Sequence, residues 1–260
     1  RGVGQGDHIA IIGSNRPELY WSMVAAQTIG AIPVPVYQDA VPDEMIYILE
    51  HCNVKFVIAE DQEQVDKISE LSSRLKRLEQ TIFLDPRGMR KYEKSNLTSF
   101  ADIQAIGRKN EQTLFEVYNE RFENHSSGDT CVMLYTSGTT GKPKGVMLSS
   151  HNLRAMIEGY VPDVDNVYSS DTALYAAPLS HGAGLYNIIF VKFGSRHSVP
   201  VSGKFVPLEI LKLAPKLKNV CMFLAPTMVN KLVETTAKTN LNVDQIRTIV
   251  YGGGPMYFAD

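Results

Sequence analysis

Residues 135–145 of this 260-residue chain read Tyr-Thr-Ser-Gly-Thr-Thr-Gly-Lys-Pro-Lys-Gly. An apolar run at residues 131–134 leads into this segment, and a second at 146–148 leads out of it. Short apolar runs on both sides of a glycine-rich polar segment predict a strand, a loop and a second strand. Backbone N–H groups, hydroxyl groups and two lysines suit a polyphosphate, so the loop predicts a nucleotide-using enzyme, with ATP as the natural ligand.

The segment is not a Walker phosphate loop. A Walker loop requires a glycine, four further residues, then Gly-Lys and Ser or Thr. Here Lys142 is followed by Pro143, and Thr136 stands where the first glycine is required. Pro143 and Gly145 also prevent a helix from starting directly after Lys142. The phosphates are therefore expected on a hairpin-like loop, and the alternative is a surface turn with incidental lysines.

The rest of the chain alternates between short apolar runs and helical patterns. Strands are expected at residues 8–12, 32–37, 55–59, 81–84, 172–177, 196–201, 220–224 and 247–251. Helices are expected at residues 17–30, 42–52, about 65–78, 151–160, 183–193, 206–213 and 226–238, with Ser14 and Asn15 as possible caps of the first. Repeated strand–helix–strand units predict an α/β fold of mainly parallel sheets flanked by helices.

Two subdomains are expected within this fold. Residues 86–129 are the least regular part of the chain, with possible helices at 99–106 and 112–122. They end in a turn-rich segment at 124–129, which indicates a boundary between subdomains 1–125 and 126–260.

The composition excludes several classes of protein. The net charge of −2 argues against a basic surface that binds nucleic acid. The sequence has no run of about 18 apolar residues, so no transmembrane helix is predicted. A peripheral membrane contact is compatible with the sequence. Cys52, Cys131 and Cys221 are odd in number and far apart, which argues against a disulfide framework and a zinc site. A reducing, cytoplasmic location is therefore expected.

Segment 135–145 closely resembles the signature loop of the adenylate-forming superfamily, which includes acyl-CoA synthetases, firefly luciferase and the adenylation domains of peptide synthetases. Every fixed position of that pattern is met. Three further stretches resemble the family in the right order, namely residues 31–36, Pro-Leu-Ser-His-Gly-Ala-Gly-Leu at 178–185 and Tyr-Gly-Gly-Gly-Pro-Met at 251–256. The resemblance covers nearly the whole chain and implies part of the large N-terminal domain of an adenylate-forming enzyme.

The resemblance implies that the signature loop closes over the pyrophosphate end of ATP. Adenylation is a displacement at phosphorus, in which positioning and charge neutralisation dominate. The implied nucleotide-binding residues are Thr136, Ser137, Gly138, Thr139, Thr140, Gly141, Lys142 and Lys144. Lys142 and Lys144 would offset the charge of the β- and γ-phosphates. Lys144 and Thr140 are also implied in catalysis, and Thr140 in contact with Mg²⁺.

His181 is the second candidate of interest. It lies in a strand-to-helix turn, where α/β sheets bind ligands, although a lone loop histidine is usually a solvated surface residue. The resemblance places it beside the carboxylate–phosphate junction as a catalytic and substrate-binding residue, with Gly182, Ala183 and Gly184 opening space for the acid. The other five histidines, His51 among them, are expected to be structural.

Residues 252–255 form the third candidate. Three glycines let a flat ring approach the backbone closely, and the resemblance implies an adenine-binding turn made by Gly252, Gly253, Gly254 and Pro255. The family usually has alanine where this chain has Gly254. A tight turn before a helix is the structural explanation, and the two explanations are compatible.

The function implied by the resemblance is ATP-dependent activation of a carboxylic acid, in the first instance a fatty acid, as an acyl-adenylate and its transfer to coenzyme A. The alternatives are an aryl- or amino-acid-activating ligase and a non-catalytic nucleotide- or acyl-binding module. The family's Mg²⁺-binding glutamate, its ribose-binding aspartate and its C-terminal lid domain with the catalytic lysine would follow residue 260. A fragment without the lid domain, inactive alone, is therefore expected.

Overall fold

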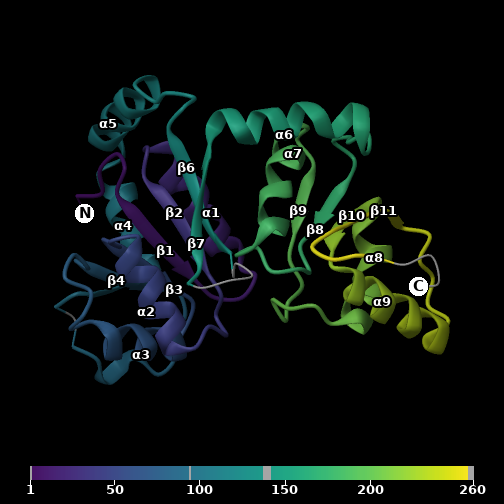
Figure 1. Cartoon of the computed structure of the whole chain (residues 1–260), viewed down its shortest axis with the longest axis horizontal. Helices are drawn as coiled ribbons and strands as arrows, with labels where there is room; N and C mark the ends of the chain where they lie inside the picture. The colour runs from purple at the N-terminus through teal and green to yellow at the C-terminus, as the bar shows by residue number, and fades with distance from the viewer. Residues whose placement is uncertain (1, 94, 137–141, 257–260) are drawn as a thin grey trace. The chain divides into compact units, whose positions relative to one another are not determined.

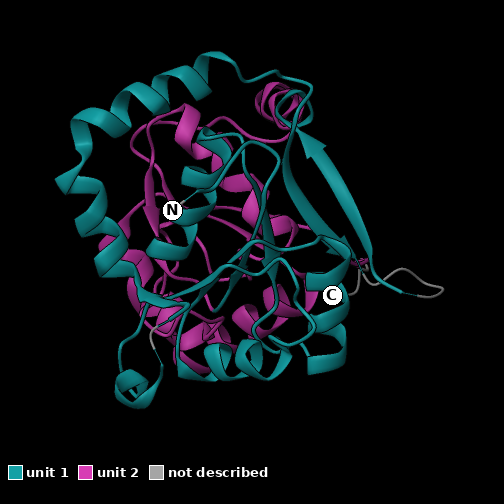
Figure 2. Cartoon of the chain, turned by 90° about the vertical axis from the view of Figure 1, so that its left-hand side faces the viewer, with its two compact units in different colours: residues 1–13, 18–152 teal, residues 14–17, 153–260 magenta. Residues whose placement is uncertain are grey.

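The computed structural model describes residues 2–93, 95–136 and 142–256 and has an α/β architecture (Figure 1). Its contacts divide the chain into two compact units, which are coloured separately in Figure 2. Unit 1 comprises residues 1–13 and 18–152, and unit 2 comprises residues 14–17 and 153–260. The predicted fold class, with mainly parallel sheets flanked by helices, is confirmed.

Unit 1 contains a five-stranded parallel sheet in the order β2-β1-β3-β4-β5. The strands are β1 (His8–Ile12), β2 (Ile32–Val36), β3 (Phe56–Ala59), β4 (Gln80–Phe83) and β5 (Leu97–Ser99). The first helices between them are α1 (Pro17–Thr28), α2 (Pro42–His51) and α3 (Gln62–Leu71). Ala10 and Ile12 of β1 pack in one core with residues of α2 and α3, whereas Ile9 and Ile11 pack in another with residues of α1. Both faces of the sheet are thus buried, as is typical of parallel sheets.

Three details of unit 1 differ from the prediction. The helix expected to reach residue 78 ends at Leu71. Leu75 is buried, but it lies in the turns that follow the helix. Strand β5 was not expected, because its three residues, Leu-Thr-Ser, carry little β pattern and pair on one side only. Within the least regular segment, the short 3₁₀ turn η1 (Met89–Lys91) was not expected, whereas α4 (Phe100–Lys109) and α5 (Glu111–Glu123) confirm the possible helices at 99–106 and 112–122.

The glycine-rich segment joins two antiparallel strands, β6 (Thr130–Thr136) and β7 (Lys144–Ser149), as predicted. Strand β6 packs beside β2, and its Met133 belongs to the core of unit 1. The hairpin therefore belongs to unit 1. For this reason unit 1 extends to residue 152.

Unit 2 contains a four-stranded parallel sheet in the order β11-β10-β8-β9. The strands are β8 (Thr172–Leu174), β9 (Arg196–Ser198), β10 (Val220–Leu224) and β11 (Ile246–Tyr251). The remaining helices are α6 (Ser150–Asp163), the 3₁₀ helix η2 (Gly182–Tyr186), α7 (Asn187–Lys192), α8 (Pro207–Leu217) and α9 (Pro226–Thr239). Apolar residues of β8 and β10 pack with Ile210 and Leu211 of α8 and Leu232 of α9. Strand β8 ends earlier than predicted, because residues 175–177 turn away into the loop that carries His181.

Two further properties of the described residues concern the cysteines and membrane-spanning helices. All three cysteines are buried and unpaired. Within the described ranges, no helix is both long enough and apolar enough to span a bilayer.

Candidate functional site

The candidate residues fall on both units. The signature loop joins β6 to β7 in unit 1, and the His181 loop and the glycine turn belong to unit 2. The predictions for Ser137, Gly138, Thr139, Thr140 and Gly141 lie outside the described residues. Thr136 and Lys144 are described and face each other as the last pair of the hairpin. Both are exposed, as is Lys142. The ammonium groups of Lys142 and Lys144 are therefore accessible to an anionic ligand at the loop end of this hairpin.

The sheet of unit 2 has a topological switch point between β8 and β10. From β8 the chain moves to β9 on one side, and then returns to β10 on the other. In open parallel sheets, ligands bind outside the carboxyl ends of the strands at such a point. The loop with His181 follows the carboxyl end of β8, and residues 252–255 follow that of β11, the other neighbour of β10. Both motifs of unit 2 therefore leave the same edge of one sheet.

A buried asparagine shapes the loop after β8. The Asn15 side-chain amide donates hydrogen bonds to the carbonyl oxygens of Tyr175 and Ala177, both at 2.9 Å. Its side-chain oxygen accepts a hydrogen bond from the Leu179 N–H at 2.8 Å. Asn15 is only 3% exposed, so its polar groups need these partners. The sequence suggested only a capping role for Asn15, because its three partners lie far away in the chain.

The His181 side chain is exposed at the end of this loop. Its backbone N–H donates to the Pro178 carbonyl at 3.2 Å, and its carbonyl accepts from the Gly184 N–H at 2.8 Å. A Cβ at residue 184 would lie 2.1 Å from the Leu179 carbonyl oxygen, whereas one at Gly182 would meet open space. Close packing of the loop against itself thus explains Gly184, and Gly182 is the glycine that leaves room beside His181.

Phe223 of β10 connects the two motifs of unit 2. Its ring stacks on that of Tyr186 with a centroid distance of 4.6 Å. A Cβ at Gly252 would lie 3.1 Å from the Phe223 ring, so a glycine is the best fit there. Tyr186 and Phe223 also line a cavity of about 10 Å³ together with Ala183. Because ligand sites are typically several hundred Å³ in volume, this cavity is too small for an acid substrate.

The glycine turn itself has one strict requirement and one permissive position. Gly253 has a φ of +84°, in the left-handed region that favours glycine. A Cβ at Gly254 would make only an ordinary contact, 3.9 Å from Pro226. An alanine, usual in the family at this position, would therefore also fit, and the departure at Gly254 does not alter the turn.

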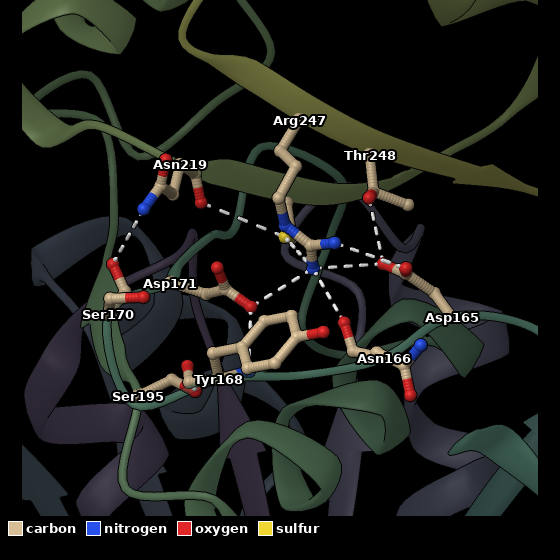
Figure 3. A network of polar contacts seen from close by, with 10 residues as sticks. Asp165, Asn166, Tyr168, Ser170, Asp171, Ser195, Asn219, Arg247 and Thr248 are labelled. Carbon is tan, nitrogen blue, oxygen red and sulfur yellow. Dashed lines mark hydrogen bonds and ion pairs between the residues drawn. The ribbon is translucent and has the colours of Figure 1, made fainter.

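The opposite edge of the same sheet carries a closed polar network (Figure 3). The Arg247 guanidinium is 2.9 Å from an Asp165 carboxylate oxygen and 3.0 Å from one of Asp171. It also donates to the Asn166 carbonyl at 2.9 Å and lies over the Tyr168 ring. Partial burial alone would lower the pKa of Arg247, but its hydrogen bonds, first of all to Asp165, outweigh this and leave the pKa raised.

The structure also bears on metal binding. Thr140, the expected Mg²⁺ contact, lies outside the described residues. In the part of the chain that is described, no group of three or more His, Cys, Asp or Glu residues could hold a metal ion.

Comparisons with known proteins show the family of this chain. A family model described as "AMP-binding enzyme" matches residues 1–258. The human long-chain-fatty-acid–CoA ligase ACSBG1 is 29% identical over 152 residues, which cover 58% of this chain and 20% of the relative. The 4-coumarate–CoA ligase of Vanilla planifolia is 26% identical over 264 residues, which cover 98% of this chain and 44% of the relative. The chain thus spans less than half of the length of these curated relatives.

A solved structure shows the same fold. The anthranilate CoA ligase AuaEII, in complex with anthranoyl-AMP, superposes with a TM-score of 0.78 at 20% sequence identity. The match covers 97% of this chain and 46% of that protein.

Proposed function

This chain belongs to the family of AMP-binding enzymes, and from that premise we propose that it activates a fatty acid with ATP as an acyl-adenylate for transfer to coenzyme A. The observation that carries the proposal is the common position of the His181 loop and the turn 252–255 at the carboxyl edge of one sheet, next to its switch point. The chain spans less than half of the length of these curated relatives, so the activity of the whole protein is part of this proposal.

The proposed reaction has two steps. In the first, a carboxylate oxygen of the acid attacks the α-phosphorus of ATP, and the bond to the β-phosphate oxygen breaks to release pyrophosphate. In the second, the coenzyme A thiol loses its proton and its sulfur attacks the acyl carbonyl, so that AMP leaves and a thioester forms. Negative charge moves from the carboxylate to a pyrophosphate oxygen in the first step, and from sulfur through the carbonyl oxygen to a phosphate oxygen of AMP in the second. Cations or hydrogen-bond donors that face those oxygens accelerate both steps.

Each candidate residue has a role in this proposal. Lys142 and Lys144, exposed at the hairpin, offset the charge of the β- and γ-phosphates. The turn 252–255 binds the flat adenine ring, since glycines allow its close approach. His181 lies beside the carboxylate–phosphate junction, where its imidazole donates a hydrogen bond to the transferred oxygens. Gly182 leaves room there for the acid.

An aryl acid is the second candidate substrate. The 4-coumarate–CoA ligase matches 98% of this chain, whereas the match to the human long-chain ligase covers 58%. The activities named for these two relatives differ in the acid and agree in the coenzyme A ligase class. A module that binds nucleotide without catalysis is the third candidate, and it shares the nucleotide-binding residues.

Calorimetry with non-hydrolysable acyl-adenylate analogues tests the proposal. We expect the chain to bind a long-chain fatty acyl sulfamoyl-adenosine more tightly than its coumaroyl counterpart. His181→Ala is expected to weaken binding of the fatty analogue about tenfold, equivalent to about 1.4 kcal/mol. Lys192→Ala, an exposed cation on α7 of the same unit, is the matched control and should bind as the parent does.

Four outcomes separate the alternatives. Tighter binding of the coumaroyl analogue would select the aryl substrate. Equal binding of ATP and both analogues would favour a nucleotide-binding module. No binding of any of the three, or binding that a Lys142→Ala/Lys144→Ala double variant leaves unchanged, would overturn the nucleotide site.

A further inference from the structure

Four side chains of unit 1 form a continuous chain of contacts beside the signature loop. The Lys142 ammonium nitrogen lies 5.2 Å from the centroid of the Tyr47 ring. The Tyr47 ring stacks on the His51 ring at a centroid distance of 5.6 Å and an interplanar angle of 23°. His51 Nδ1 is 2.6 Å from the Tyr135 hydroxyl oxygen, and the two rings meet edge to face. We call these four residues the Tyr47 cluster.

The cluster is built on a firmly held helix. Tyr47 and His51 lie four residues apart on α2, so their side chains share one face of it. The opposite side of α2 is fixed by buried apolar residues, among them Met45 and Leu49, both at 0% exposure. The Tyr47 ring therefore occupies a defined position. A loop side chain that contacts the ring is restricted in its own position.

Tyr135 braces the cluster from the strand that enters the loop. Burial, and then the neighbouring Cys52 and Tyr47, raise the pKa of Tyr135, so its hydroxyl stays protonated at neutral pH. The hydroxyl can then donate to His51 Nδ1. Tyr135 also lies against Gly145, where a Cβ would come within 3.2 Å of its ring. The cluster thus links α2 to both strands at the described ends of the loop.

We propose that Tyr47 is a positioning residue that holds the Lys142 ammonium group ready for the phosphates of ATP, with His51 and Tyr135 bracing its ring. This inference rests on the proposed function, because it assigns Lys142 a phosphate. A lysine carries a compact charge on a flexible stem and loses much conformational freedom when a ligand orders it. The face of Tyr47 attracts the ammonium group and restricts that freedom before binding. Such pre-organisation increases affinity by reducing the entropy lost on binding.

An ammonium group can serve both partners. It has three N–H groups, and contact with the ring face leaves others free to donate to phosphate oxygens. The ring attracts the charge through its quadrupole and forms no ion pair, so it does not neutralise the lysine.

Calorimetric titration of the chain with ATP tests the inference through two substitutions at one position. Tyr47→Leu keeps an apolar side chain but removes the ring face, and is expected to weaken ATP binding about fivefold. Tyr47→Phe keeps the ring face and should bind ATP within about twofold of the parent. His51→Leu removes the brace and should give an intermediate loss. Circular dichroism of each variant verifies that it folds.

A double-mutant cycle separates positioning from a general structural effect. In a Lys142→Met background, Tyr47→Leu should have no further effect on ATP binding, because the side chain that it positions is gone. An unchanged fivefold loss in that background would show that Tyr47 acts on something else and would overturn the inference.

A second readout needs no ligand. In the NMR spectrum of the ligand-free chain, the Lys142 side-chain protons next to the amine should be shifted upfield by the ring and return to ordinary values in Tyr47→Leu. Normal shifts in the parent would overturn the inference even if ATP binds. ATP binding that Tyr47→Leu leaves unchanged or tightens would overturn it alone, whereas no ATP binding by the parent would overturn the proposed function as well.

Discussion

The two edges of the sheet in unit 2 are built from different chemistry. At the amino ends of the strands, Arg247 of β11 closes a network with Asp165 and Asp171 (Figure 3). At the carboxyl ends, glycines and an exposed histidine, His181, follow β11 and β8. The same strands thus end in paired charges on one side and in open backbone on the other.

Stability and ligand binding thus place opposite demands on the two ends of the strands in one sheet. A buried charge stabilises the fold only when its partners are present, and Asp171, with a side chain 1% exposed, has Arg247 as its partner. A ligand site needs accessible groups and a backbone that can be approached, which closed ion pairs would prevent. We therefore expect substitutions at the amino edge to change folding and most of those at the carboxyl edge to change binding.

The largest effect is expected at the amino edge. Asp171→Ala removes a carboxylate that accepts from Arg247 and from the Tyr168 N–H, and leaves the half-buried guanidinium with fewer partners. Loss of the acceptor of the Tyr168 N–H together with one of the two carboxylate partners of the guanidinium destabilises a fold by about 3 kcal/mol. Urea denaturation of the chain measures the loss. Asp165→Ala is the matched variant and should cost less, because the Asp165 side chain is 19% exposed and Asp171 still pairs with Arg247.

The contrary result would be that Asp171→Ala leaves the denaturation midpoint unchanged and weakens binding of the acyl-adenylate analogue. The amino edge would then belong to the binding site.

An intermediate effect is expected at Gly184, the one carboxyl-edge position where we predict a loss of stability. The added methyl group of Gly184→Ala would lie 2.1 Å from the Leu179 carbonyl oxygen, so the loop backbone must shift. Overpacking of this kind costs about 1–3 kcal/mol. Gly182→Ala is the matched control, since its methyl group meets open space. Thermal unfolding should distinguish the two variants, and equal midpoints would contradict the close packing at Gly184.

The smallest effect concerns pH and a residue within the sheet. Burial lowers the pKa of His197, whose Nδ1 lies 2.7 Å from the Tyr175 hydroxyl oxygen. As the pH falls past the ordinary histidine value of 6.5, the unfolded chain takes up the proton before the folded one does. The free energy of unfolding therefore decreases from about pH 7 downward, until the pH reaches the lowered pKa of the folded state.

His197→Asn tests this contribution, because asparagine keeps a polar partner for Tyr175 but does not titrate. The variant should lose less stability than the parent between pH 7 and pH 5 in urea denaturation. His8, whose pKa is also lowered by burial, is present in both proteins, so its contribution cancels in the comparison. Parallel pH profiles of the two proteins would be the contrary result.

Local patterns of sequence predicted most elements of this fold. The apolar runs at β1, β3 and β10 are short and almost unbroken, and the residues around each are polar or break helices, so these strands were predicted correctly. Strand β5 was missed because its three residues depend on pairing with β4. The contact of β6 with β2 joins distant segments and therefore has no local signal in the sequence.

The candidate site divides in the same way. The motifs of unit 2 were found from local sequence, and the structure places both at one sheet edge. The roles of Asn15 and Tyr47 were not predicted, because their partners lie far along the chain. A single buried asparagine or a tyrosine on a helix carries no local signal of such a contact.

The hydrogen bonds of Asn15 determine when, during synthesis of the chain, the His181 loop can form. Asn15 precedes its first partner, Tyr175, by 160 residues. At typical rates of synthesis, on the order of ten to thirty seconds pass before that partner is joined to the chain. Unit 1 is complete in sequence by then, while residues 14–17 still await the unit to which they belong. The His181 loop therefore takes its final shape only when Asn15 meets a segment that is made 160 residues later, and a ribosome-bound chain stopped before residue 175 would lack it.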